Sequence, residues 1–111
     1  MMPNSKKLSK KTVNGVTFVE ESDNIYRDLG FAESEAINLL ARSELMMEIE
    51  KTIKSKGLTQ SQAAKLLGVA QPRLSDLFNG KIEKFTVDML MKWLAKLGKK
   101  VSIRVTDQEV A

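Results

Sequence analysis

The chain has 111 residues and a formal net charge of +4, and it contains neither cysteine nor histidine. This length suits one domain with a modest core. The missing residue types exclude disulfides, thiolate and imidazole metal ligands and the commonest general base, so we expect no metal, no other cofactor and no enzymatic activity. The beginning of the chain is unlike a signal peptide, and no apolar stretch approaches the roughly 20 residues of a membrane span. We therefore expect a cytoplasmic protein that does not enter a membrane.

The charge is unevenly distributed along the chain. Residues 59–111 contain nine basic and five acidic residues, which accounts for the whole net charge of +4, whereas residues 1–58 contain nine of each. A basic half indicates a surface that neutralises phosphates. From Glu20 to Glu50, nine acidic residues stand against two basic ones, a net charge of −7. This acidic block indicates either a basic partner or simply a solvated helix face.

We divide the chain into a flexible basic N-terminal arm, residues 1–23, and a domain, residues 24–111. Met1 to Thr12 is polar and contains four lysines, which predicts disorder. The run Val13-Asn14-Gly15-Val16 places Asn-Gly between β-branched residues, a signal for a hairpin turn, and Thr17 to Val19 follows as a short strand. A hairpin of this size is marginal in water and must lie against another part of the protein.

The domain begins with two predicted helical segments. Asn24 to Gly30 mixes apolar and polar residues and predicts a turn or short helix. From Glu33 to about Lys56 apolar residues recur at spacings of three and four, which predicts a long helix that ends at Gly57. Its predicted buried stripe consists of Ile37, Leu40, Ala41, Leu45, Ile49 and Ile53, thickened by Met46 and Met47.

Leu58 to Gly80 predicts two short helices joined by a tight turn. Thr59 is a good N-cap, and Gln62 three residues later completes a capping box. Gly68 ends the first helix, and Pro72 favours the start of the second. Any two-helix corner needs some of these features, but their combined order favours the helix-turn-helix, whose second helix lies in the DNA major groove.

The last part of the chain predicts one more helix and then a strand. Thr86 can cap a helix that ends near Gly98. From Lys99 to Thr106 apolar residues alternate with polar ones, as in a strand. A strand needs a partner, which is either the Thr17–Val19 segment or the same strand of a second subunit. We favour the second subunit, because it would also cover Met89 and Trp93, which form an extra apolar stripe on the preceding helix.

Leu58 to Gly80 resembles the helix-turn-helix of the lambda repressor and Cro-like family, also called the xenobiotic-response-element (XRE) family. The run Asp76 to Gly80 follows the ending of that family's recognition helix. From Asn24 to Val105 the chain is similar to HigA-like antitoxins, which are encoded beside a RelE-like ribonuclease toxin. The features that match are Asn24 to Gly30, the long helix, Phe85, and the closing run Leu97 to Ile103.

This resemblance implies an all-α, lambda-repressor-like helix-turn-helix domain with a short C-terminal β-strand, acting as a dimer. It also implies which residues contact DNA. Gln60 matches a phosphate contact, Gln71 and Arg73 match the base-reading positions, and Ser75 matches a position that reaches a base edge or a phosphate. Pro72 departs from the family, because it contributes no donor where a polar residue is common.

The chemistry of these residues agrees with such roles. Gln71 can pair bidentately with adenine and Arg73 with guanine, each worth about 1–3 kcal/mol of discrimination. We expect Asp76, three residues after Arg73, to hold that arginine in place rather than to contact cytosine. Lys81 and Lys84 follow the recognition helix and are expected to contact phosphates. Asn79 completes the predicted DNA-binding set.

The predicted function is that of a sequence-specific repressor. One recognition helix reads few base pairs, so we expect a homodimer on an inverted repeat in double-stranded DNA, with half-sites about 34–36 Å apart. The resemblance implies the antitoxin of a type II toxin-antitoxin pair, which represses its own operon and neutralises a RelE-like ribonuclease toxin. The uneven charge predicts that the acidic Glu20–Glu50 region and the preceding hairpin engage this toxin, which must be basic to hold RNA. The alternative is a free-standing or phage-derived regulator of the XRE family that has no toxin partner.

Overall fold

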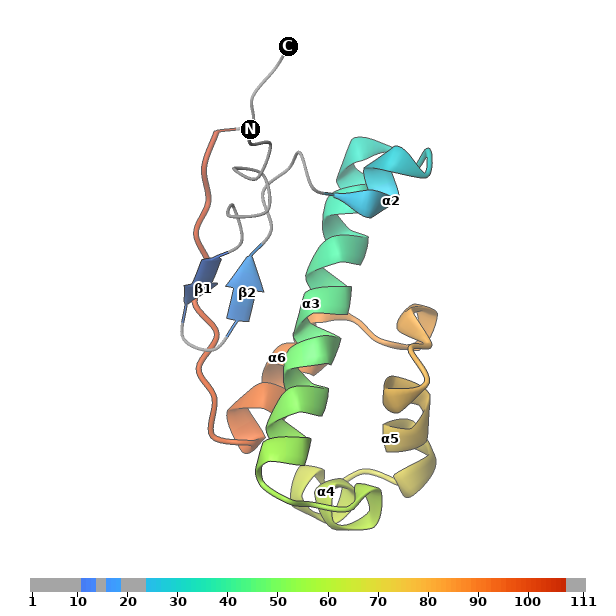
Figure 1. Cartoon of the computed structure of the whole chain (residues 1–111), viewed down its shortest axis with the longest axis vertical. Coiled ribbons are helices and arrows are strands. Elements are labelled where there is room, and N and C mark those ends of the chain that lie inside the picture. Colours follow the sequence, from blue (N-terminus) through green and yellow to red (C-terminus); the bar gives the residue numbers. More distant parts are fainter. Residues whose placement is uncertain (1–10, 14–15, 19–23, 108–111) are drawn as a thin grey trace, which may run out of the picture.

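The computed structural model describes residues 11–13, 16–18 and 24–107. Much of the predicted N-terminal arm, including the Asn14-Gly15 turn, lies outside these residues. The elements are β1 (Lys11–Val13), β2 (Val16–Phe18), α2 (Ile25–Asp28), α3 (Glu33–Ser55), α4 (Gln60–Leu67), α5 (Gln71–Phe78), the 3₁₀ helix η2 (Ile82–Lys84) and α6 (Val87–Lys96). The long helix α3 is the centre of the molecule, and α4, α5 and α6 surround its second half (Figure 1).

Two short strands lie on either side of the predicted hairpin turn. β1 and β2 pair antiparallel, with Val13 opposite Val16 and Thr12 opposite Thr17. β2 begins at Val16, one residue earlier than expected. Lys11 and Thr12, which the sequence assigns to the disordered arm, belong to β1. The hairpin lies against α3, which is the support that so small a sheet needs.

The predicted C-terminal strand is wrong for the single chain. Residues 99–107 carry no regular secondary structure, although their alternating pattern suits a strand. β2 pairs with β1 rather than with this segment. The preferred mate, the same strand of a second subunit, stays a prediction. Val101 packs against the core, while Ile103 and Val105 are exposed. Sequence alternation indicates a preference for strand, but only a hydrogen-bonded neighbour makes one.

The predicted long helix is confirmed within one residue at its C-terminal end, where Gly57 follows the cap residue Lys56. Its second half buries Leu45, Ile49 and Ile53 as expected. Its first half differs, because Ala36 and Leu39 are buried while Ile37 is exposed. The two halves pack against different neighbours, α2 at the start and α5 and α6 later, so no single stripe describes the whole helix.

Asn24 attaches α2 to α3. Its side-chain oxygen accepts hydrogen bonds from the backbone N–H groups of Tyr26 (3.0 Å) and Arg27 (3.3 Å). Its Nδ2 donates to the carbonyl oxygen of Ala36 on α3 (3.1 Å), and the residue is almost completely buried. The predicted short helix over Asn24–Gly30 is therefore present, and one side chain both caps it and fixes it to the centre of the fold.

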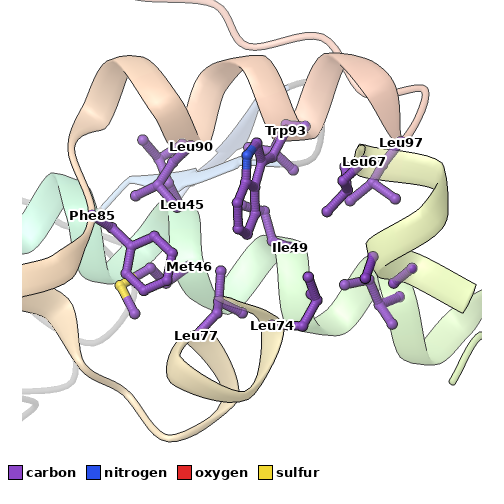
Figure 2. Packing of buried hydrophobic residues seen from close by; sticks show 14 residues of the cluster. Leu45, Met46, Ile49, Leu67, Leu74, Leu77, Phe85, Leu90, Trp93 and Leu97 are labelled. Carbon is purple, nitrogen blue, oxygen red and sulfur yellow. The ribbon is translucent and has the colours of Figure 1, made fainter. Parts of the chain in front are cut away.

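The core lies between the second half of α3 and the helices α4, α5 and α6 (Figure 2). The Phe85 and Trp93 rings meet edge to face, with centroids 5.6 Å apart. Trp93 is only 5% exposed, so it is a core residue of the single chain. The expectation that a second subunit covers it is wrong, because the connection after α5 brings Phe85 over it. The labelled core side chains are Leu45, Met46, Ile49, Leu67, Leu74, Leu77, Phe85, Leu90, Trp93 and Leu97.

Candidate nucleic-acid interface

The first helix of the predicted pair, α4, begins and ends as its sequence requires. The N–H of Gln62 donates to Thr59 Oγ1 (3.0 Å), and the N–H of Thr59 donates to Gln62 Oε1 (2.8 Å), which is the expected capping box. Gly68 then takes a φ of +74°, a left-handed conformation that costs glycine little. The N–H of the following Val69 donates back to the carbonyl of Ala64 (3.0 Å). This closes α4 and turns the chain toward α5.

The second helix, α5, is supported from behind by leucines. Leu74 and Leu77 are buried in the core, whereas Gln71, Pro72 and Asn79 are exposed. Pro72 lies in the first turn, where a helix loses nothing by lacking its N–H, although the helix starts one residue earlier, at Gln71. α5 lies at the edge of the molecule, beside α3 (Figure 1). The predicted projecting helix is present.

Three polar residues of α5 and its C-cap form a row, which we call the polar row: Gln71, Ser75 and Asn79. They are four residues apart, so they lie along one side of the helix. Asn79 Nδ2 is 3.5 Å from Ser75 Oγ. Gln71 and Asn79, the two ends of the row, are exposed and face away from the side that buries Leu74 and Leu77. It places hydrogen-bonding groups where a base edge would lie if α5 entered a major groove.

Arg73 takes an unexpected position. Its guanidinium carbon lies 4.6 Å from the centroid of the Phe85 ring. Its Nη2 donates to the carbonyl oxygen of Lys84 (3.2 Å) and lies 3.0 Å from Met89 Sδ. The side chain is half-buried and runs back along the protein toward the start of α6. The structure thus separates Arg73 from the polar row.

Asp76 pairs with two lysines rather than with Arg73. One carboxylate oxygen lies 3.7 Å from Lys81 Nζ, and the other lies 3.6 Å from Lys84 Nζ. The expected pair with Arg73 is wrong, because the arginine leans toward Phe85 while the chain after α5 folds its lysines back onto Asp76. Both lysines remain about half exposed.

The segment that carries these lysines, residues 81–85, is called the basic connection below. Arg42 of α3 holds it from the other side: its Nη1 donates to the carbonyl oxygens of Ile82 (3.1 Å) and Phe85 (3.4 Å). Sequence reasoning counted Arg42 only as a charge and missed this role. The sequence feature that could have indicated this role is that Arg42 is one of only two basic residues, against nine acidic ones, between Glu20 and Glu50.

The remaining predicted contact, Gln60, is the first residue of α4 and is half-buried. Within residues 24–107 and the two short strands, no group of three or more histidine, cysteine, aspartate or glutamate side chains could hold a metal ion. No helix in the same part of the chain is long and apolar enough to span a membrane.

Two short helices in this order, the second one projecting and followed by a basic connection, define the helix-turn-helix class of DNA-binding domains. A family model described as a helix-turn-helix domain matches residues 25–106. A solved structure described as an XRE family transcriptional regulator is similar to the chain with a TM-score of 0.63 and 32% sequence identity, over 67% of this chain and 83% of that one. The comparison with curated proteins gives no match. The chain belongs to this helix-turn-helix family, and its domain is of the XRE type.

Proposed function

We propose that the protein is a sequence-specific transcriptional repressor that reads DNA with α5. The observation that carries this proposal is the geometry of α5, with buried Leu74 and Leu77 on one side and the polar row exposed at both ends of the other. The family of the chain supports DNA as the ligand. Residues 59–111, which contain the helix-turn-helix, hold the whole net charge of +4, as phosphate binding requires.

Within this interface the residues take different roles. The polar row reads base edges, and Gln71 in the first turn of α5 is suited to adenine, whose N6 and N7 match its amide. Gln60, Lys81 and Lys84 contact phosphates and thereby fix the register of α5 on the duplex. Pro72 preorganises the first turn of the helix and donates no hydrogen bond.

A homodimer gives such a helix useful specificity. One recognition helix covers only a few base pairs, so two copies on an inverted repeat, with half-sites about 34–36 Å apart, read a longer sequence. The C-terminal segment exposes Ile103 and Val105, apolar side chains that a second copy would cover. Trp93, which is buried in the single chain, does not support this dimer.

Binding-site selection tests the proposed function. The full-length protein is incubated with a library of random duplexes, and bound DNA is amplified and sequenced over several rounds. We expect one inverted repeat to be enriched, with affinity for it about 10³-fold or more above that for random duplex. Enrichment of no sequence, with equal binding to all duplexes, would contradict sequence-specific reading by α5.

A second function, neutralisation of a toxin, is favoured by a patch at the opposite end of α3 from α4. Four large apolar residues are exposed in α2, in the connection after it and in the first turns of α3, and we call them the apolar patch: Ile25, Leu29, Phe31 and Ile37. Asp28, Glu33 and Glu35 occur among them in the sequence, although Glu33 is paired with Arg27 (3.1 Å). An apolar surface with acidic residues suits a basic protein, such as a ribonuclease of the RelE type, which needs positive charge to hold RNA.

The double variant Leu29→Ala, Ile37→Ala tests this function. We expect it to weaken binding of a basic toxin, encoded beside this gene, by about tenfold or more, since exposed apolar anchors carry much of the energy of an interface. Calorimetry measures the affinity, and Met47→Ala, an exposed apolar residue elsewhere on α3, is the matched control. Full binding by the double variant would remove the apolar patch from the interface. If the gene has no neighbouring toxin, the free-standing or phage-derived regulator is the correct alternative.

A further inference from the structure

The basic connection is held from two sides by arginines. Arg42 of α3 donates to the carbonyl oxygens of Ile82 and Phe85. Arg73 of α5 donates to the carbonyl oxygen of Lys84 and stacks on the Phe85 ring. A segment of five residues thus has three carbonyl oxygens and one ring fixed by side chains from two other helices. The position of this segment relative to α5 depends on these contacts.

The contacts of Arg73 compete with base reading. A guanidinium that reads guanine lies in the plane of the base and offers two N–H groups to its O6 and N7 atoms. In the structure the same group lies over the Phe85 ring at 4.6 Å, within the range of a cation–π contact, and one of its nitrogens is engaged by the Lys84 carbonyl. The stack occupies only the face of the guanidinium, but the Lys84 carbonyl and Met89 Sδ engage Nη2, so Arg73 would have to leave these contacts to reach a base beside the polar row. The contacts of Arg73 therefore favour a role inside the protein.

The lysines beside Asp76 have the geometry of an anion site. Their ammonium groups converge on one carboxylate, at 3.7 Å from Lys81 and 3.6 Å from Lys84. A DNA phosphodiester carries the same single negative charge as that carboxylate and likewise presents two non-bridging acceptor oxygens. The two lysines are half exposed on flexible stems, so they can turn from Asp76 to a phosphate while the backbone of the basic connection stays in place.

We propose that Arg73 is a positioning residue, which holds the basic connection so that Lys81 and Lys84 form a ready-made clamp for one or two DNA phosphates beside α5. This inference rests on the proposed DNA binding by α5. Base reading then belongs to the polar row, and Arg73 sets how tightly all duplexes bind rather than which sequence is preferred. If Arg73 has this role, changing Arg73 alone removes the contacts of both Lys81 and Lys84 with DNA phosphates.

The test uses Arg73→Ala and Arg73→Lys in the full chain, with Arg104→Ala as a control for the loss of one positive charge at an exposed site. Fluorescence titrations measure affinity for the selected operator, for its single-base-pair variants and for random duplex, each over a series of salt concentrations. We expect Arg73→Ala to weaken binding to every duplex by a similar factor of about ten or more, and to lower the salt slope of log K by about 1.8, the value for two lost phosphate contacts. Arg73→Lys keeps the charge but not the planar stack, so it should behave like Arg73→Ala.

A double-variant comparison gives a second readout. When Lys81→Gln and Lys84→Gln are already present, Arg73→Ala should change the salt slope no more than Arg104→Ala does. Phe85→Leu keeps an apolar core residue but removes the ring on which Arg73 stacks, so it should weaken binding to every duplex by a similar factor. This variant replaces Arg73→Ala in the test if Arg73→Ala fails to fold.

Two results would overturn the inference. The first is loss of preference at one base pair in Arg73→Ala with an unchanged salt slope, which would make Arg73 a base-reading residue. The second is wild-type binding by Arg73→Lys, which would mean that only the charge matters. Failure of the proposed function looks different, because the wild-type protein itself would then show no operator preference.

Discussion

Phe85→Ala is expected to lower the free energy of unfolding by about 3–5 kcal/mol, the usual range for removing a buried phenylalanine. Phe85 is 1% exposed, and its ring contacts Trp93 edge to face on one side and the Arg73 guanidinium on another. Alanine would leave a cavity between α3, α5 and α6 and would also remove the surface on which Arg73 stacks. Since a domain of this size is stable by about 5–15 kcal/mol, the variant should be close to unfolding at moderate temperature.

Urea denaturation followed by the fluorescence of Trp93, the only tryptophan in the chain, measures this effect directly. Met47→Ala is a suitable control, because Met47 is 57% exposed and its truncation should change stability by less than about 0.5 kcal/mol. A loss below 1 kcal/mol for Phe85→Ala would mean that Phe85 and Trp93 do not form the centre of the core.

The local signals of the sequence were sufficient to predict most of the helix boundaries. The pair Thr59 with Gln62 caps α4 and Thr86 caps α6, as expected, and Gly68 closes α4 with a positive φ. Each of these features depends on residues within one or two turns of the chain. They can therefore be recognised without knowledge of the rest of the fold.

The features that the sequence failed to predict depend on distant contacts. The C-terminal pattern suits a strand, but in the part of the chain that the structure describes β1 and β2 pair with each other and not with this segment. Trp93 resembled a residue for a dimer interface, because nothing in its own helix shows that Phe85 closes over it. Ile37 fits the periodicity of α3 but is exposed, since the neighbour that α3 packs against changes along its length.

The proposed DNA interface shows the same contrast between features that depend on local sequence and features that depend on distant contacts. In α5, Leu74 and Leu77 are buried and Gln71 and Asn79 are exposed, which is the division that helical periodicity predicts. It also placed Arg73 outside, but periodicity gives the direction of a Cβ atom and not the end point of a long side chain. Arg73 leaves α5 near its surface and then reaches a ring and a carbonyl of the basic connection. A sequence pattern contains no information on such a reach.

Gln71→Ala is expected to remove the preference of the protein at one A·T base pair in each half of the operator. Gln71 is exposed in the first turn of α5, so its truncation should leave the fold intact. Loss of a bidentate amide–adenine contact costs about 1–3 kcal/mol, which corresponds to a roughly 5- to 150-fold loss in affinity for each matched half-site. Binding to random duplex should change little, because phosphate contacts supply that part of the affinity. Titration of the selected operator against random duplex measures both values, with Thr106→Ala, an exposed polar residue outside the helix-turn-helix, as the control.

The central claim is that α5 reads DNA through its polar row. It is tested most directly by measuring the affinities of wild type and Gln71→Ala for the operator and for every single-base-pair variant of it. We expect two profiles that coincide everywhere except at one symmetry-related pair of positions, where the variant no longer distinguishes the bases. Identical profiles at all positions would contradict it, because α5 would then not present Gln71 to the bases.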